Sequence, residues 1–302
     1  MRIGVIYGGT KEERGPSEKN AKDIAAALAK KGYDAYLKET GKGIIEKLKE
    51  EKTDVVFLCV QGKGYGDGTF QGMLEHEGIP FTGSGMRAAA LINDKILCKL
   101  LFDRCGICTP KWDILSLERY RAGDYPYEAF GYPFVAKSPT QGGSFGIELI
   151  RTPGDIKKIE SVFEYDDPIF LERFIEGRFY TVGFYEKEGS LVKLPVVEGV
   201  DLDRKDDSGD IIAFTGNYGI KSCDLSEDKQ REISDLAASV FKVTGAKGLG
   251  RVDIMVDKDL KPYVLEINAV PGLKRVSLMP QEAEIAGIVY EDMIEAILRS
   301  AL

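Results

Sequence analysis

The chain has 302 residues, of which 43% are hydrophobic and 30% charged, a composition typical of a globular protein with two or three packed lobes. Its 41 basic and 49 acidic residues leave a net charge of −8, which argues against a nucleic-acid partner but permits a nucleotide pocket with a few lysines. No apolar run approaches the ~20 residues that span a bilayer, and the cysteines show no pairing pattern. We therefore expect a cytoplasmic α/β protein without a membrane partner.

The first ninety residues alternate between strand and helix patterns. Ser17 is the expected N-cap of the first helix, and Gly32 ends that helix. The strands are predicted at residues 3–7, 34–38 and 54–60, and a second helix at 43–50. This order predicts a parallel sheet that binds ligands at the carboxyl ends of its strands. Two glycine-rich loops, at residues 8–10 and 62–68, follow strands at that edge.

A second region begins near residue 93. The predicted helices lie at residues 94–105, 153–163, 227–243 and 290–301. The predicted strands lie at residues 133–138, 146–150, 168–174, 181–185, 191–198, 250–256 and 263–268. Between the later strands, the charged and glycine-containing segment at 201–210 predicts a mobile loop.

The clearest chemical signal lies in two alternating segments near the C-terminus. Arg251 and Asp253 share one face of the first strand, and Glu266 and Asn268 share one face of the second. A hairpin turn between these strands would bring both pairs together. Two carboxylates and an amide oxygen suit Mg²⁺, which completes its coordination shell with phosphate and water. A solvent-facing strand surface, or a carboxylate neutralised by Arg251, is the alternative that these residues alone leave open.

Further motifs turn this signal into a family resemblance. A Pro271-Gly272 turn, ready to offer N–H groups to an oxyanion, follows the two strands, and Ser277-Leu278-Met279-Pro280 comes next. Together with the four side chains above, these motifs resemble the signature of ATP-grasp enzymes and, more narrowly, of the D-alanine–D-alanine ligase family. Further ordered blocks at residues 7–14, 62–72, 79–85 and 94–99 extend the resemblance over nearly the whole chain.

The resemblance implies a three-lobed α/β ATP-grasp architecture. It places an N-terminal parallel substrate domain at residues 1–92, a central ATP-grasp lobe at 93–180 and a C-terminal lobe at 181–302. The residues that it assigns to ATP lie in the phosphate-binding segments, the glycine-rich flap and the hinge strand between the lobes: Lys95, Lys137, Ser144, Glu172, Arg173, Phe174 and Ile175. It also implies two Mg²⁺ or Mn²⁺ ions, held by Asp253, Glu266 and Asn268.

The resemblance further assigns residues to the reaction itself. Arg251 and the Gly272 N–H would stabilise the oxyanion of the tetrahedral intermediate. Glu13 would pair with a substrate ammonium, while Ser277 and Leu278 would bind near the carboxylate of the second substrate. These roles imply an ATP-dependent carboxylate–amine ligase that acts through an acyl phosphate on small amino-acid-like substrates, with a homodimer and a link to peptidoglycan biosynthesis as family-level expectations.

Several positions depart from the family pattern. Gln61 stands where the family has a histidine beside the first substrate, and Gly143 replaces a flap serine. A substrate-binding loop tyrosine is not recognisable. The ribose-binding glutamate falls at Phe179, and Glu176 or Arg178 could compensate for it.

These departures leave alternatives open. A different amino acid or biosynthetic intermediate as acyl donor is one, and a non-catalytic nucleotide-binding relic is another. The losses gather on the donor side, which favours the first alternative. The retained charges argue against the second, because unpaired charges cost stability. Either Lys205 or Lys221 could approach the γ-phosphate.

Overall fold

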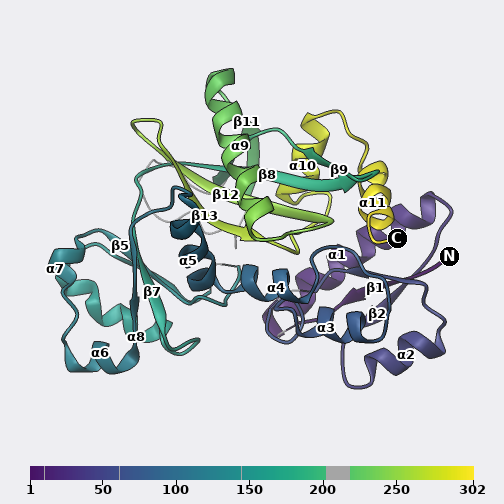
Figure 1. Ribbon diagram of the computed structural model, residues 1–302, viewed down its shortest axis with the longest axis horizontal. Coiled ribbons are helices and arrows are strands. Elements are labelled where there is room, and N and C mark those ends of the chain that lie inside the picture. Colours follow the sequence, from purple (N-terminus) through teal and green to yellow (C-terminus); the bar gives the residue numbers. More distant parts are fainter. Residues whose placement is uncertain (10, 61, 144, 202–217) are drawn as a thin grey trace.

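The computed structural model describes residues 1–9, 11–60, 62–143, 145–201 and 218–302, and its strands form three sheets (Figure 1). The predictions made for Gln61, Ser144, Lys205 and the segment at 202–210 therefore lie outside the described residues. Within the described residues, no helix is long and apolar enough to cross a membrane.

The N-terminal lobe is the predicted parallel α/β unit. Its strands β1 (Arg2–Tyr7), β2 (Asp34–Glu39) and β3 (Val55–Leu58) pair in the order β2-β1-β3, and both pairings are parallel. Four helices belong to or follow this unit: α1 (Lys11–Lys30), α2 (Ile44–Glu50), α3 (Thr69–His76) and α4 (Met86–Asn93). The apolar β3 is buried along its whole length, as its unbroken hydrophobic run predicts.

The predicted N-cap at Ser17 is wrong. Helix α1 begins six residues earlier, at Lys11, so Ser17 lies inside the helix. Its buried Oγ accepts the Gly8 N–H at 3.0 Å and donates to the Cys59 carbonyl at 2.7 Å. The hydroxyl thus finds partners in two loops outside the helix, and this tertiary contact overrides the local capping preference. The consequence is that α1 ties the glycine loop after β1 to the end of β3.

The central lobe is an antiparallel sheet with its own aromatic core. Strands β4 (Trp112–Leu115), β5 (Phe134–Lys137), β6 (Ile147–Ile150) and β7 (Ile169–Arg173) pair in the order β4-β7-β5-β6. Short helices accompany this sheet: α6 (Leu117–Ala122), α7 (Tyr127–Phe130), η1 (Pro153–Lys158) and α8 (Ile159–Val162). The predicted helix at 153–163 is therefore a 3₁₀ turn followed by one short α-helix, and β4 was not anticipated.

In the described part of the C-terminal lobe, the strands form a six-stranded sheet. Strands β8 (Gly177–Lys187), β9 (Ser190–Lys193), β10 (Val197–Asp201), β11 (Tyr218–Ser222), β12 (Leu249–Asp257) and β13 (Pro262–Asn268) pair in the order β11-β10-β8-β12-β13, and β9 adds to β8. The single strand predicted at 191–198 is wrong, because residues 194–196 separate β9 from β10. Pro195 lies in this break and has no N–H to donate to a ladder.

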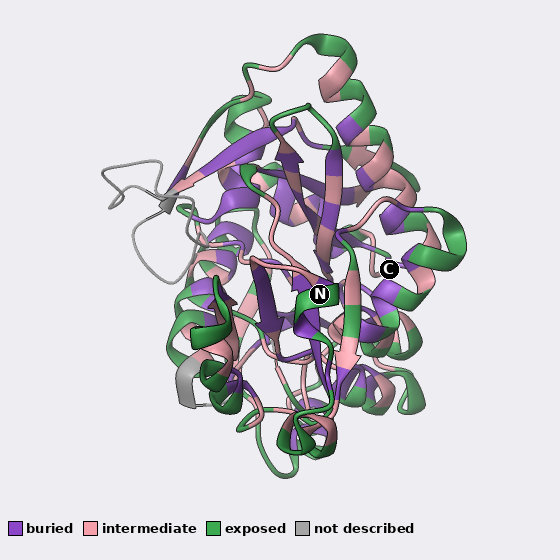
Figure 2. Cartoon of the chain, turned by 90° about the vertical axis from the view of Figure 1, so that its left-hand side faces the viewer, coloured by how far each residue is buried: buried purple, intermediate pink, exposed green. Residues whose placement is uncertain are grey.

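Helices connect the lobes by sharing hydrophobic cores with the sheets. Helix α9 (Glu227–Val243) covers one face of the C-terminal sheet, and α5 (Lys95–Cys105) packs Cys98 and Phe102 into the same core. Helices α10 (Leu278–Ile285) and α11 (Tyr290–Arg299) share a second core with β1 and α1. Buried residues accordingly follow the strands and the inner helix faces (Figure 2). The N- and C-terminal lobes thus share apolar packing, whereas the central sheet has a separate core; the domain boundaries at 92/93 and 180/181 stay predictions.

Candidate active site

The β12–β13 hairpin forms the centre of the site. The two strands are antiparallel neighbours, as predicted, and Asp253 lies directly opposite Glu266 while Arg251 lies opposite Asn268. The alternation of each strand then places all four side chains on one face of the sheet. On the other side of β12, Thr181 of β8 lies opposite Asp253.

Hydrogen bonds join these side chains into one cluster. Arg251 makes a two-pronged pair with Asp253, with Nε–Oδ1 at 2.8 Å and Nη2–Oδ2 at 2.7 Å. The Asn268 amide lies between the carboxylates, with Nδ2 3.2 Å from Asp253 Oδ2 and 3.4 Å from Glu266 Oε1. The Thr181 hydroxyl donates to Asp253 Oδ1 at 2.9 Å. These oxygen donors fit a hard divalent cation that takes its other ligands from phosphate and water.

Two lysines from distant segments complete this charged centre. Lys95 is the first residue of α5, and its Nζ lies 3.4 Å from Glu266 Oε2 and donates to the Gln141 carbonyl at 2.8 Å. Lys137 ends β5 and contacts the carboxylate of Glu172. Burial alone would raise the pKa of Glu266, but the charges of Lys95, Lys137 and Arg251 outweigh it and hold the pKa below its usual value. The ionised carboxylate is therefore available to a cation at neutral pH.

The predicted hinge segment connects the central and C-terminal sheets. Strand β7 ends at Arg173 and β8 begins at Gly177, so residues 174–176 form the link. The Arg173 N–H donates to the Lys111 carbonyl at 2.8 Å, and the Phe174 N–H donates to the Pro133 carbonyl at 3.2 Å. Phe174 and Ile175 are both half-buried. The segment is thus anchored to the central lobe where the chain crosses between the sheets.

The substrate side of the site is built from α1 and the Pro-Gly turn. The carboxylate of Glu13 lies against Gly62, where a Cβ atom would collide with it. Asn20, further along α1, accepts the Leu273 N–H at 2.8 Å and so holds the turn that contains Gly272. Ser277 precedes α10 and is 3% exposed, and its buried Oγ has no hydrogen-bond partner among the described residues. An orphaned buried hydroxyl beside Gly272 is the kind of group that a polar ligand would satisfy.

The positions that depart from the family pattern are also placed by the structure. Phe179 is 5% exposed in β8, so its ring belongs to the interior. Arg178 contacts the carboxylates of Glu198 and Asp224, and Lys221 lies 3.2 Å from Glu198. The cationic groups of Arg178 and Lys221 are thus already engaged by acidic side chains of the same lobe.

Sequence reasoning missed Glu282, a fully buried carboxylate on α10. Its Oε2 accepts the Gly183 N–H, and its Oε1 has no hydrogen-bond partner among the described residues. Gly183 makes room for this side chain, because a Cβ there would lie 2.6 Å from Oε2. The burial of Glu282 could have been anticipated from its spacing, because it lies three and four residues after the buried Met279 and Leu278 and so shares their helix face. Burial raises the pKa of Glu282 to about 8.

This raised pKa predicts that Glu282 makes stability fall with rising pH. In the unfolded chain the group ionises near its ordinary pKa of 4.5, whereas in the folded chain it stays protonated up to about 8. The contribution of Glu282 to the free energy of unfolding is complete below its unfolded-state pKa of 4.5. As pH rises from there toward the folded-state pKa of about 8, this contribution is lost, by on the order of 1 kcal/mol per pH unit. Glu282→Gln should therefore gain stability over wild type between about pH 5 and pH 8 in denaturant titrations. Glu284→Gln, at an exposed position on the same helix, is the control and should show the same dependence of stability on pH as wild type. If Glu282→Gln also showed the wild-type pH dependence, Glu282 would be ionised in the folded protein and the prediction would be wrong.

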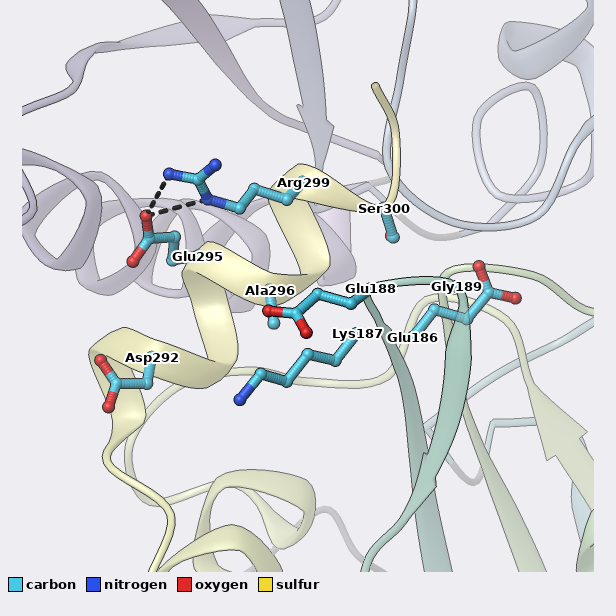
Figure 3. A pocket seen from close by; sticks show the side chains of 9 residues that line it. All are labelled: Glu186, Lys187, Glu188, Gly189, Asp292, Glu295, Ala296, Arg299 and Ser300. Atoms are coloured by element: carbon cyan, nitrogen blue, oxygen red, sulfur yellow. Dashed lines mark hydrogen bonds and ion pairs between the residues drawn. The ribbon is translucent and has the colours of Figure 1, made fainter.

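A surface hollow of about 600 Å³ lies apart from these residues (Figure 3). It is lined by the β8–β9 turn and α11, which contribute nothing to the cluster described above. The lining residues are mostly charged and solvated: Glu186, Lys187, Glu188, Gly189, Asp292, Glu295, Ala296, Arg299 and Ser300. Within it Arg299 pairs with Glu295 at 2.9 Å, and Lys31, which directly follows α1, pairs with Asp292 and Glu295. Asp292, Glu295 and Arg299 are thus held in ion pairs, and we assign the hollow no chemistry.

Comparison with known proteins gives the same picture over the whole chain. Residues 101–299 match the family model described as the D-ala D-ala ligase C-terminus. The D-alanine–D-alanine ligase of Pelotomaculum thermopropionicum is 33% identical over 321 residues, covering 100% of this chain and 97% of that protein. The D-alanine–D-alanine ligase of Geobacter sulfurreducens is 34% identical, covering 99% of this chain and 94% of that protein.

A solved structure supports the same fold. The crystal structure of D-alanine–D-alanine ligase from Bacillus anthracis complexed with ATP superposes with a TM-score of 0.85 at 28% sequence identity. The match covers 100% of this chain and 97% of that chain. The predicted three-lobed ATP-grasp architecture with an N-terminal parallel unit is confirmed.

Proposed function

Because this chain belongs to the D-alanine–D-alanine ligase family, we propose that it is an ATP-dependent ligase that joins two small amino-acid-like substrates through an acyl phosphate. The proposal rests on one observation, namely that charged side chains from distant segments lie together on one face of the C-terminal sheet. Arg251 and the two hairpin carboxylates, Asp253 and Glu266, lie beside Lys95, which comes from a segment about 160 residues earlier in the chain. This proximity supports the proposal, because a phosphate-activating ligase needs metal-binding carboxylates and phosphate-binding cations side by side.

The nucleotide would lie between the central and C-terminal sheets. Lys95 and Lys137 would bind the phosphates, with the glycine-rich residues at 141–146 covering them through backbone N–H groups. The Arg173 N–H already bonds to Lys111, so the carbonyl of Arg173 and the N–H of Ile175 would form the hydrogen bonds to the adenine edge. Phe174 would pack against the ring. The three lobes at residues 1–92, 93–180 and 181–302 would then correspond to substrate binding and the two halves of the ATP grip.

Asp253, Glu266 and Asn268 would hold two Mg²⁺ ions between the protein and the phosphates. When bound, these ions neutralise the charge that develops during phosphoryl transfer. The number of ions is taken from the family resemblance, which also allows Mn²⁺ in place of Mg²⁺. Among the described residues there is no metal-binding group of three or more His, Cys, Asp or Glu side chains. The amide of Asn268 is therefore an essential part of the proposed ligand set.

The reaction then proceeds in two balanced steps. A carboxylate oxygen of the first substrate forms a bond to the γ-phosphorus while the bond from phosphorus to the ADP oxygen breaks. The ammonium of the second substrate first gives up one proton to solvent, and its amine nitrogen then forms a bond to the acyl carbon. The bond from that carbon to the bridging oxygen breaks, inorganic phosphate leaves with this oxygen, and the nitrogen loses a second proton to the departing phosphate, which leaves a neutral amide. Arg251 and the Gly272 N–H stabilise the oxyanion between these events. Glu13 binds a substrate ammonium, and Ser277 with Leu278 binds the carboxylate of the acceptor.

We expect D-alanine to serve poorly as the acyl donor but to remain acceptable as the acceptor. The sequence departures at Gln61, Gly143 and the loop tyrosine all fall on the donor side, whereas Ser277-Leu278 is retained. Each lost hydrogen bond to a charged substrate costs on the order of 1.5–3 kcal/mol, so two or three losses would lower donor affinity by several orders of magnitude. Steady-state phosphate release from ATP, first with D-alanine alone and then with a panel of amino acids and acids paired with D-alanine, measures this.

The same assay tests the proposed function as a whole. Phosphate release that requires a different acid identifies the donor and supports an altered first-substrate site. A kcat/KM of about 10⁴ M⁻¹s⁻¹ or better with D-alanine as sole substrate would show that the missing donor-side groups are dispensable. Nucleotide binding without phosphate release for any substrate would favour the non-catalytic relic. The homodimer, the cytoplasmic location and the choice between Lys205 and Lys221 at the γ-phosphate remain predictions.

A further inference from the structure

Lys99 is a charged side chain that the proposed reaction leaves without a role. It lies on α5, one turn after Lys95, and it is 0% exposed. Its Nζ contacts Glu172 Oε1 and Thr109 Oγ1 and lies 3.3 Å from the Val264 carbonyl. These contacts come from β7, from the segment before β4 and from β13. A lysine held by three acceptors and closed off from solvent is not placed to bind a ligand itself.

Glu172 joins this buried lysine to one that can reach the nucleotide. The Glu172 residue is 2% exposed, and its second oxygen, Oε2, contacts Nζ of Lys137. The Lys137 side chain is 15% exposed, against 1% for that of Lys99. One buried carboxylate is therefore shared by a permanently enclosed ammonium and by an ammonium at the edge of the site.

The charge states of this trio are linked. Burial would raise the pKa of Glu172, but Lys137 and Lys99 outweigh it and hold the pKa below its usual value. Burial lowers the pKa of Lys99, and the contact with Glu172 opposes that shift. Removing one partner of a buried ion pair is strongly destabilising, because the remaining charge loses its compensation. Glu172 thus needs at least one ammonium beside it at all times.

This requirement conflicts with a phosphate-binding role for Lys137 unless another cation stays behind. If Lys137 were the sole partner of Glu172, a movement of Lys137 toward a phosphate would leave a buried carboxylate unpaired. The free energy of nucleotide binding would then be less favourable by the cost of that unpaired charge. With Lys99 fixed on Oε1, the carboxylate remains compensated when Lys137 turns away. We propose that Lys99 is a positioning residue for nucleotide binding, which serves as the permanent counter-ion of Glu172 and so releases Lys137 to the phosphates.

The inference rests on the proposed function, since it assumes that Lys137 binds ATP phosphates. It also gives the Glu172 side chain a different task from direct nucleotide contact, namely to hold Lys137 in the absence of ATP. The Val264 carbonyl adds a geometric link, because Val264 precedes the metal-site residue Glu266 by two positions on β13. Lys99 therefore fixes α5, β7 and β13 relative to one another at the point where the lysines and the acids meet.

The test compares Lys99→Met, Glu172→Gln and the double variant by calorimetric titration with Mg²⁺-ADP, which needs no amino-acid substrate. Lys99→Met should weaken binding at least about tenfold, because Lys137 then becomes the sole partner of Glu172. Adding Glu172→Gln to it should tighten binding at least about threefold relative to Lys99→Met, because no buried carboxylate is left to retain Lys137. Arg104→Met, an exposed position on the same helix, is the matched control and should bind like wild type.

A purely structural role for Lys99 predicts the opposite order, because a second core substitution would leave the double variant as weak as Lys99→Met or weaker. That result overturns the proposal, as does unchanged binding by Lys99→Met. If Lys99→Met does not fold, the double variant is compared with Glu172→Gln alone. Equal affinity supports the proposal, because Lys99 then acts only through Glu172, whereas weaker binding by the double variant overturns it. Failure of the wild-type protein to bind Mg²⁺-ADP at all would instead contradict the proposed function.

Discussion

Replacing Glu266 with glutamine is expected to lower kcat at least about 100-fold while the protein stays folded. The substitution removes one of two carboxylates that would hold Mg²⁺ against the phosphates, and such a cation contributes several kcal/mol to the transition state, where each 1.4 kcal/mol is about tenfold in rate. Asn268→Ala should act in the same direction, because it removes the amide oxygen of the same ligand set.

The fold should tolerate the change at Glu266 for reasons visible in the hairpin. The Glu266 side chain is 32% exposed, and glutamine preserves its shape. Asp253, directly across the strand pair, keeps its two hydrogen bonds from Arg251 after the change. Lys95 loses an ion pair at 3.4 Å but keeps the Gln141 carbonyl as an acceptor. Steady-state kinetics at saturating Mg²⁺, combined with thermal unfolding, would separate the two effects.

Asp259→Asn is the matched control for this experiment. Asp259 is an exposed acid in the turn of the same hairpin, so the substitution changes the net charge equally without touching the site. It should leave kcat unchanged. Near-normal turnover by Glu266→Gln at saturating Mg²⁺ would remove Glu266 from the ligand set and, with it, the proposed position of the metal.

The hairpin was predictable because its signal is local. Alternation fixes which side chains share a face, and a short turn fixes which strands are neighbours, so Arg251, Asp253, Glu266 and Asn268 could be grouped from sequence alone. The parallel order of the N-terminal strands was predictable for a similar reason, because helical crossovers between apolar strands allow few topologies.

What could not be predicted depends on contacts between distant segments. Ser17 looks like a helix cap, and only the position of Cys59 and Gly8 shows that its hydroxyl is used elsewhere. Lys99 looks like one more lysine on an amphipathic helix until β7 brings Glu172 to it across 73 positions of sequence. Glu282 on α10 is buried because Gly183 on β8 leaves space for it. Each of these residues acquires its environment from the tertiary structure, which local patterns do not encode.

Arg251→Met is expected to abolish most activity and, unlike Glu266→Gln, to destabilise the protein. The guanidinium has five N–H donors, of which the pair with Asp253 uses two, so donors remain for the developing oxyanion. Removing a single preorganised donor to an oxyanion typically lowers kcat by about 10²–10³. The loss of stability arises at Asp253, which is 3% exposed and, among the described residues, would keep only the hydrogen bonds from Thr181 and Asn268.

A second substitution separates the two effects of Arg251→Met. Breaking a buried ion pair from one side costs about 3–5 kcal/mol, chiefly because the remaining charge is left uncompensated. Arg251→Met/Asp253→Asn should therefore be more stable than Arg251→Met alone in denaturant titrations, although it should remain inactive because both the oxyanion donor and a metal ligand are gone. Lys258→Met, in the exposed hairpin turn, should match wild type in both measurements. Were Arg251→Met as stable as wild type, Asp253 could not depend on the arginine to compensate its charge. Were the kcat of this variant also unchanged, the oxyanion would have to be stabilised by the Gly272 N–H and other groups.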